Sequence, residues 1–171
     1  MKYYHGTNKD YDYFNIDLAM IYKDFGRGMY LAKEKWHAES IALGKNGTHA
    51  YIRVYDIDFT KLRTVLNIKE FKKASTPWIK YVIENRNKIV NPQFDVVIGA
   101  TADAAAQKEI ESFYRKYRHK DASRKDYRDL MSRLDVYKYP TQVALLTQKA
   151  IDYAEQNYIE TICIKGADNG T

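Results

Sequence analysis

Two short motifs dominate the start of this chain: Tyr4-His5-Gly6-Thr7 and Asp24-Phe25-Gly26-Arg27-Gly28-Met29-Tyr30-Leu31. They combine a histidine, a threonine, three glycines and several aromatic rings. Glycine lets a ligand approach the backbone, while histidine, threonine and tyrosine offer neutral hydrogen bonds and an aromatic face. This combination indicates a nucleotide-binding pocket.

Outward from these motifs, the sequence predicts strands and helices in an irregular order. Strands are expected at residues 1–5, 28–32, 50–56, 94–99, 141–146 and 158–164, with a turn at 6–8. Helices are expected at 35–44, 104–118, 125–134 and 148–156, and one more begins at Pro77. Regular strand–helix alternation is missing, and no glycine-rich turn opens a helix as in a dinucleotide-binding Rossmann unit. The order therefore predicts an α+β fold.

Composition indicates a single soluble domain over residues 1–171. Hydrophobic residues make up 45% of the chain, and no stretch reaches the roughly 18 apolar residues of a membrane span. The N-terminus lacks the apolar run of a signal peptide, so we expect a cytoplasmic protein without membrane contact. The only cysteine, Cys163, lies in an apolar run and is expected in the core. The four histidines lack zinc-ligand spacing, so no metal site is expected.

Positive charge is concentrated between Lys108 and Lys138, a segment that holds ten lysines and arginines against six acidic residues. Four tyrosines are interleaved with these charges, namely Tyr114, Tyr117, Tyr127 and Tyr137. Contact with RNA or DNA fits this pattern. A solvated helical face with mixed charges fits it too and is the simpler interpretation.

Other catalytic signatures are weak or missing. Asp24-Phe25-Gly26 resembles the metal-binding triplet of protein kinases, but nothing upstream could form the glycine-rich and catalytic loops that a kinase needs. The chain also lacks the Gly-x-Ser-x-Gly motif of serine hydrolases. Arg86, near the end of the helix that begins at Pro77, fits either a phosphate contact or favourable placement against the helix dipole.

In order and approximate spacing, the two opening motifs resemble those of the ADP-ribosyltransferase superfamily, in the branch whose triad is His, Tyr and Glu. That branch includes diphtheria toxin and the poly(ADP-ribose) polymerases. The chain is more closely similar to DUF3990, a bacterial family of uncharacterised function assigned to this superfamily. Three further segments carry that likeness, at residues 83–86, 94–103 and 141–150. The resemblance implies a split, mixed or antiparallel β-sheet core with flanking helices.

The resemblance also implies NAD as cofactor and a role for each motif residue. His5 would hydrogen-bond the adenosine-side ribose, the Gly6 backbone would hold the nicotinamide carboxamide, and Thr7 would fix a ribose or phosphate. Tyr30 would stack on the nicotinamide ring. The remaining NAD-binding positions implied by the second motif are Phe25, Gly26, Arg27 and Gly28.

The third triad position departs from the family pattern. Gln142 stands where the resemblance leads us to expect the catalytic glutamate. In the superfamily reaction, a carboxylate stabilises an oxocarbenium-like ribose cation, and an amide keeps the hydrogen bond without the charge. Loss of one preorganised electrostatic partner raises the activation free energy by about 3 to 4 kcal/mol, so we expect the natural chain to be a slowed transferase. A Gln142→Glu variant is expected to hydrolyse NAD faster. Asp103 is either a substitute carboxylate or a helix N-cap.

Taken together, the resemblance implies an NAD-dependent ADP-ribosyltransferase that modifies a macromolecular acceptor, protein or nucleic acid, as a bacterial toxin or phage-defence effector. Two alternatives remain open. One is a non-catalytic module that binds NAD or ADP-ribose. The other is an RNA-directed ADP-ribosyltransferase or 2′-phosphotransferase-like protein that contacts RNA through residues 108–138.

Overall fold

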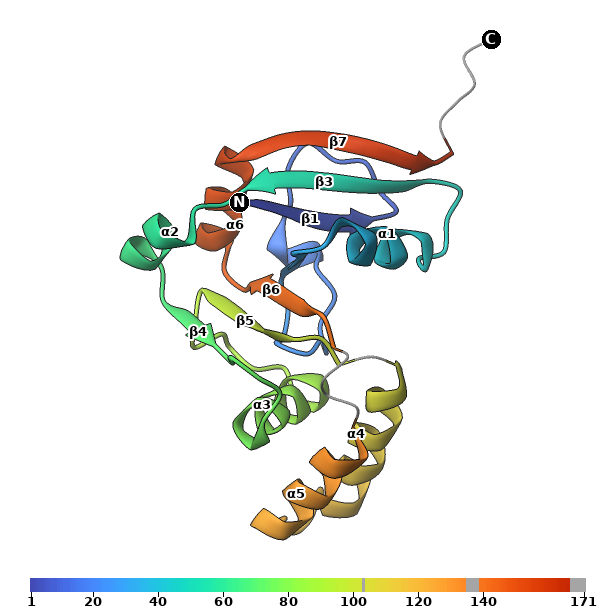
Figure 1. The fold of residues 1–171 in the computed structure, drawn as a ribbon, viewed down its shortest axis with the longest axis vertical. Coiled ribbons are helices and arrows are strands. Elements are labelled where there is room, and N and C mark those ends of the chain that lie inside the picture. Colours follow the sequence, from blue (N-terminus) through green and yellow to red (C-terminus); the bar gives the residue numbers. More distant parts are fainter. Residues whose placement is uncertain (103, 135–138, 167–171) are drawn as a thin grey trace.

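A computed structural model of the chain describes residues 1–102, 104–134 and 139–166 (Figure 1). Seven strands, six α-helices and one 3₁₀-helix lie within these ranges. The strands are β1 (Lys2–Thr7), β2 (Met29–Ala32), β3 (Ala50–Asp56), β4 (Ile68–Glu70), β5 (Val96–Ala100), β6 (Thr141–Leu145) and β7 (Tyr158–Lys165). The helices are α1 (Lys35–Leu43), α2 (Phe59–Val65), α3 (Thr76–Asn87), α4 (Ala104–Tyr117), α5 (Arg124–Arg133) and α6 (Gln148–Gln156), and the 3₁₀-helix is Ile16–Leu18.

The described strands form one mixed sheet in the order β4-β5-β6-β2-β1-β3-β7. β4 and β5 are parallel, and the other neighbouring strands are antiparallel. This arrangement confirms the predicted α+β class. β1 and β2 share a single register pair, Tyr4 with Ala32, whereas β1 pairs with β3 at six positions. We call the unpaired stretch beyond Tyr4 and Ala32 the β1–β2 split.

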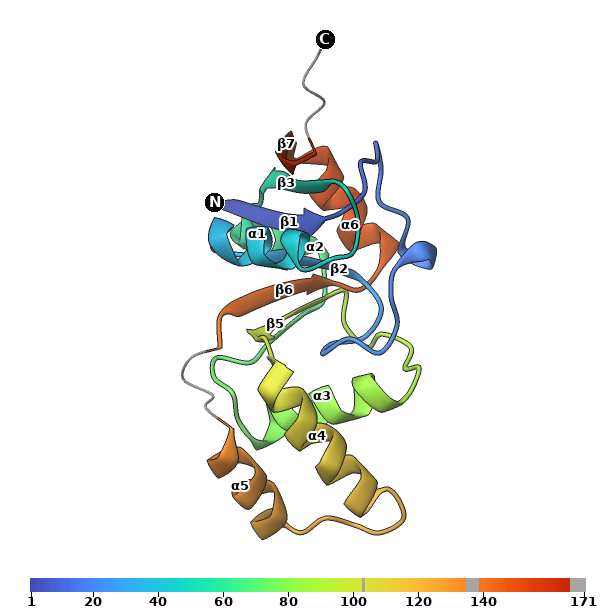
Figure 2. The ribbon, with the colours of Figure 1, turned by 90° about the vertical axis from the view of Figure 1, so that its right-hand side faces the viewer.

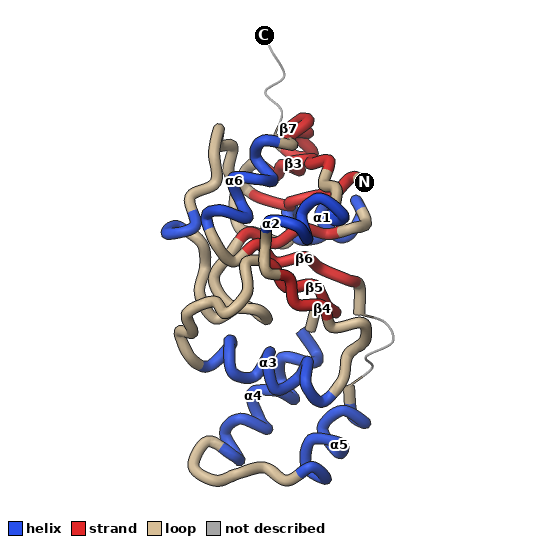
Figure 3. Tube along the Cα trace, turned by 90° about the vertical axis from the view of Figure 1, so that its left-hand side faces the viewer, coloured by secondary structure: helices blue, strands red, loops and turns tan. Residues whose placement is uncertain are grey.

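Helices cover both faces of the sheet (Figures 2 and 3). Side chains alternate along a strand, so Met29 and Leu31 of β2 join the core beneath α2 and α6. Tyr30 packs against the core built by α3, α4 and α5, while Ala32 packs against α1. Because Tyr30 and Ala32 share one face of β2, α1 and the α3–α5 group lie on the face opposite α2 and α6.

The structure confirms most of the predicted helices and strands, and these are the ones whose local sequence pattern is strong. Gly44 ends α1 and a capping box formed by Ser123 and Asp126 opens α5. α2 and β4 were not predicted, because each is very short and α2 carries a single buried residue, Leu62. The predicted turn at residues 6–8 is wrong at its start, because β1 continues through Thr7 and pairs there with Tyr51 of β3.

Cys163 does not lie in the core, which corrects the prediction from its apolar neighbours. β7 is an edge strand, and its alternate residues Ile162 and Ile164 pack inward with α1 and β3. The intervening Cys163 is therefore exposed, with Sγ 3.3 Å from the Lys165 carbonyl oxygen. Separately, none of the described helices combines the length and apolar character that a membrane span needs.

Candidate functional site at the β1–β2 split

His5 is a buried histidine at the β1–β2 split. Its ring makes edge contacts with Tyr11 and Phe14, which belong to the long segment after β1, at centroid distances of 6.4 and 5.7 Å. Nδ1 lies 2.8 Å from the backbone carbonyl oxygen of Tyr30, so Nδ1 carries the proton and donates it. Burial, aided by the positive charge of Lys45, lowers the pKa of His5 to about 4. At neutral pH the ring is uncharged, and Nε2 keeps a lone pair that can accept a hydrogen bond.

Lowering the pH is expected to destabilise the fold through His5. Between the usual histidine pKa of about 6.5 and the folded-state pKa of about 4, the unfolded chain binds a proton that the folded chain excludes. The contribution of His5 to stability is therefore complete above pH 6.5, and roughly 3 kcal/mol of it is lost as the pH falls to 4. Urea unfolding at pH 7.5 and 4.5 measures this difference. A His5→Asn variant should lose this part of the pH dependence, while exposed His119→Asn keeps it; equal pH dependence in all three proteins contradicts the assignment.

Gly6, next to His5, allows the backbone to approach α1 closely. A Cβ at this position would lie 2.1 Å from the Ala38 carbonyl oxygen, so no larger residue fits without moving the helix. The Gly6 carbonyl oxygen accepts a hydrogen bond from Lys45 Nζ at 2.8 Å. Burial, together with nearby Lys23, lowers the pKa of Lys45 to about 8. The family resemblance assigns the Gly6 backbone to the nicotinamide carboxamide, and in this structure the carbonyl oxygen of that backbone is bonded to a lysine.

Thr7 and Arg27 flank the split. Thr7 is buried, and its hydroxyl accepts from the Lys9 amide at 3.2 Å, which fixes the chain as it leaves β1. Arg27 is partly exposed and lies 3.9 Å from Asp17, a weak contact between side chains that are 43% and 82% exposed. Arg27 can therefore reorient toward a ligand, whereas Thr7 is already engaged with the backbone.

Tyr30 organises the second motif around its phenol. Its hydroxyl donates to the Gly26 carbonyl at 2.8 Å and accepts from the Phe25 amide at 3.0 Å. The Phe25 ring stacks on the Tyr30 ring at 6.5 Å with an 18° interplanar angle. Gly26 adopts a φ of 100°, which disfavours other residues, and Gly28 permits β2 to approach Leu145 of β6. Burial raises the pKa of Tyr30, so its phenol stays neutral.

Gln142 belongs to a buried polar cluster centred on Asp24. Its Nε2 donates to Asp24 Oδ2 at 2.8 Å, and the Ala102 amide donates to the same oxygen at 2.9 Å. Asp24 Oδ1 is paired with Arg86, at 2.7 Å from Nε and 2.5 Å from Nη2. Arg86 also donates to the Ala102 carbonyl, while its buried Nη1 has no partner among the described residues. In this structure Arg86 is the ion-pair partner of Asp24, a role that differs from both interpretations drawn from the sequence, a phosphate contact and placement against the helix dipole.

The side chains of the three expected triad residues lie on two faces of the sheet. His5 shares the face of Tyr3, which packs in the core beneath α2 and α6. Tyr30 and Gln142 share the opposite face, because Tyr30 pairs with Ala144 and Gln142 lies two residues before it. The structure joins His5 to Tyr30 through the backbone carbonyl and brings Tyr30 and Gln142 into diagonal positions on neighbouring strands. Asp103, the suggested substitute carboxylate, lies outside the described residues.

Sequence reasoning missed three residues that contribute to the site. Asp24 had no assigned role although it precedes Phe25-Gly26, and its contact with Gln142 spans 118 residues. Tyr11 and Lys45 lie in segments without regular periodicity, and only the fold brings them to His5 and Gly6. None of these three had a local sequence signal beyond its residue type.

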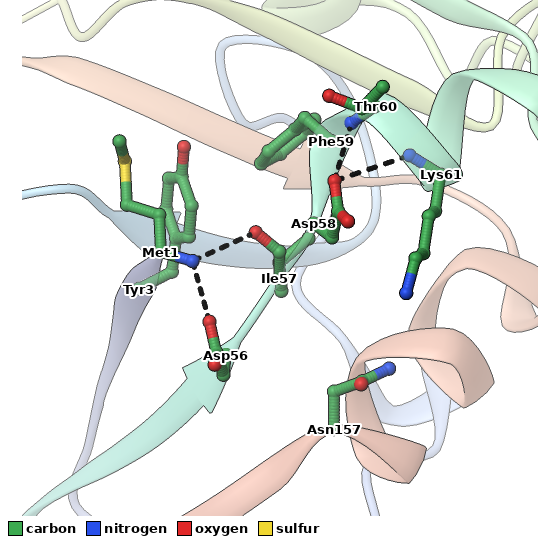
Figure 4. Close-up of a pocket in the computed structure, with 9 residues that line it drawn as sticks. All are labelled: Met1, Tyr3, Asp56, Ile57, Asp58, Phe59, Thr60, Lys61 and Asn157. Atoms are coloured by element: carbon green, nitrogen blue, oxygen red, sulfur yellow. Dashed lines mark hydrogen bonds and ion pairs between the residues drawn. The ribbon is translucent and has the colours of Figure 1, made fainter.

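Two surface pockets lie away from His5. The first has a volume of about 560 Å³ and is lined by residues around Met1, Asp56 and Lys61 (Figure 4). The second, about 510 Å³, is lined by Lys72, Lys73, the start of α3 and Thr141, the neighbour of Gln142. Within the described residues, no group of three or more His, Cys, Asp or Glu side chains is arranged to hold a metal ion.

The model of a family described as "Protein of unknown function (DUF3990)" matches residues 1–155. No curated protein and no solved structure matches the chain.

Proposed function

This chain belongs to the DUF3990 family, and we propose that it binds NAD at the β1–β2 split and transfers ADP-ribose to a macromolecular acceptor. The observation that carries the proposal is the buried, neutral His5. Its Nδ1 proton is held by the Tyr30 carbonyl at 2.8 Å, so Nε2 is oriented as an acceptor. A ribose hydroxyl is a suitable donor for that nitrogen.

The other polar groups at the split fit NAD if one side chain moves. The Gly6 carbonyl can accept from the nicotinamide amide once Lys45 Nζ, 2.8 Å away, leaves it. Arg27 at the rim, partly exposed, has a guanidinium suited to phosphate. When bound, NAD supplies the ADP-ribose group and nicotinamide as leaving group. The chain's own residues bind, orient and shield the ribose side of the bond that joins ribose to nicotinamide.

Gln142 limits the rate that this site can reach. Its Nε2 donates to Asp24 at 2.8 Å, so a hydrogen bond from a ribose hydroxyl would have to be accepted by Oε1. The amide brings no negative charge, and Asp24 is already paired with Arg86. The missing charge raises the activation free energy of transfer by about 3 to 4 kcal/mol. Transfer is therefore expected to be roughly a hundred to a thousand times slower than with a carboxylate.

The same cluster favours a second candidate function, a non-catalytic module that binds NAD or ADP-ribose. In such a module Gln142 and Asp24 serve only to hold β6 against the Asp24–Gly28 turn. Binding would then occur without release of nicotinamide, which distinguishes the two functions.

Titration of NAD into the purified chain, with a parallel assay for nicotinamide release, tests the proposal. Wild-type protein should bind NAD and, with labelled NAD and a cell extract, release nicotinamide and label an acceptor. His5→Asn should weaken NAD binding at least about tenfold because an accepting nitrogen is lost, equivalent to roughly 1.4 kcal/mol. Exposed His119→Asn is the matched control and should bind NAD as wild type does.

The outcomes separate the candidate functions. Binding without nicotinamide release supports the module, and binding with release supports the transferase. Absence of NAD binding by folded wild-type protein, or equal binding by the two histidine variants, would overturn the assignment of the split as an NAD site.

A further inference from the structure

α4 and α5 form a helical hairpin that projects away from the sheet, at the end opposite β7 (Figures 1 and 3). Its inner faces are apolar, with the Phe113 and Tyr127 rings 5.0 Å apart and Leu130 buried beside them. Arg133 donates to Glu109 at 2.9 Å, which links the two helices near the base of the hairpin. The hairpin therefore holds its tip in a defined position.

The tip of the hairpin, residues 115–125, is strongly basic. It contains six lysines and arginines and one aspartate, so most of the chain's net charge of +6 is concentrated in 11 residues. All six cationic residues are exposed, namely Arg115, Lys116, Arg118, Lys120, Arg124 and Lys125. Such a density of exposed positive charge attracts a polyanion.

Neighbouring carboxylates do not neutralise this tip. Among the residues that the structure describes, its one ion pair is Arg115 with Glu111, at 3.8 Å and largely exposed, which is a weak contact. Asp126 is engaged in the capping box of α5 and with the Tyr117 hydroxyl. Lys116 and Lys120 instead lie over the Tyr117 ring, 4.9 and 5.4 Å from its centroid. The cations are therefore held in place and still available to an external anion.

The chemistry of the tip suits single-stranded RNA better than a membrane. The described part of the hairpin has no large exposed hydrophobic side chain that could insert among lipids. Half-buried Tyr114 borders the cationic residues, and unpaired bases can stack on such a ring. Exposed His119, between Arg118 and Lys120, has ring nitrogens that can hydrogen-bond to a ribose 2′-hydroxyl.

We infer that the hairpin tip, residues 115–125, binds single-stranded RNA through its phosphates. The surface is separate from the β1–β2 split, so the inference holds whether or not the chain transfers ADP-ribose. If both proposals hold, the hairpin would position an RNA, or an RNA-bound protein, beside the α3–α5 side of the domain.

Fluorescence anisotropy with a labelled 20-nucleotide single-stranded RNA of mixed sequence tests the inference. The full chain is titrated at 50, 100 and 200 mM salt. A triple variant with Arg118→Gln, Lys120→Gln and Arg124→Gln should bind about 10 to 100 times more weakly at 100 mM salt. Its log–log salt slope should also be smaller by about 2, because each lost phosphate contact removes about 0.7.

A matched control removes three exposed lysines elsewhere, with Lys2→Gln, Lys61→Gln and Lys88→Gln. It has the same net charge as the tip variant and should lose less than about threefold in affinity. Equal weakening of the two variants, or no salt-dependent binding by wild type, would overturn the inference. Tighter binding to DNA of the same sequence, to an RNA duplex or to phosphatidylserine vesicles would also overturn it.

Discussion

Replacement of Arg53 by methionine is expected to destabilise the protein by about 3 to 5 kcal/mol, because it leaves Glu155 buried without its partner. Arg53 is only 3% exposed, and its Nη2 lies 2.9 Å from Glu155 Oε2. Nε donates to the Tyr55 hydroxyl at 2.8 Å and Nη1 donates to the Tyr11 carbonyl at 2.5 Å. Because Tyr11 contacts the His5 ring, the same change should also loosen the segment that covers the β1–β2 split.

Urea unfolding of three variants checks this result. Arg63→Met removes an ion pair with Glu70 whose side chains are 47% and 40% exposed, and it should cost less than about 1 kcal/mol. Combining Arg53→Met with Glu155→Leu should recover more than half of the loss, since the uncompensated charge is gone. A cost of Arg53→Met similar to that of Arg63→Met would show that the buried pair contributes little.

A glutamate at position 142 is expected to destabilise the protein by about 3 to 4 kcal/mol at pH 8 and by much less at pH 5, both relative to wild type at the same pH. Gln142 Nε2 donates to Asp24 Oδ2, so a carboxylate there would face a second carboxylate in a buried site. The pKa of one of the pair would rise strongly, and its protonation at pH 5 would restore the hydrogen bond. For this reason the gain of NAD hydrolysis that the family resemblance implies for Gln142→Glu is expected to come with a loss of stability.

A charge swap isolates this contact. Adding Asp24→Asn to Gln142→Glu should remove most of this pH dependence and recover part of the stability at pH 8, because one carboxylate and one amide again face each other; loss of the Asp24–Arg86 ion pair limits the recovery. The matched surface control is Gln107→Glu, which places a carboxylate beside exposed Glu111 at 3.1 Å and should cost less than about 0.5 kcal/mol. No pH dependence in the Gln142→Glu cost, or no recovery in the swap, would contradict the role of Asp24.

Local patterns predicted much of the fold. The alternating pattern of β3, the apolar run that contains β5 and Gly44 at the end of α1 each act within a few residues, and the structure confirms these elements. α2 and β4 could not be found this way, because they are stabilised by packing rather than by a repeating pattern. Cys163 was misplaced because its apolar neighbours do not reveal that β7 is an edge strand.

The site was less predictable than the fold. The residue types of His5, Tyr30 and Gln142 could be read from the motifs, but the face on which each side chain lies depends on strand order and register. The partners Asp24 and Arg86 are 62 residues apart, and Lys45 is 39 residues from Gly6. Such contacts depend on tertiary structure and have no periodic signal in a single sequence.

The position of β6 in the sheet affects how the chain folds during synthesis. β6 lies between β5 and β2, yet it comes after both helices of the hairpin in the sequence. Until residues 141–145 have left the ribosome, β2 and β5 each present an unpaired edge, and the centre of the sheet is missing. Strands synthesised early, such as β1 and β3, can pair with each other before then, but closure of the sheet requires contacts of still longer sequence separation and is expected to be slow. A nascent chain of this protein therefore depends on protection of those edges until β6 has been synthesised and can pair with them.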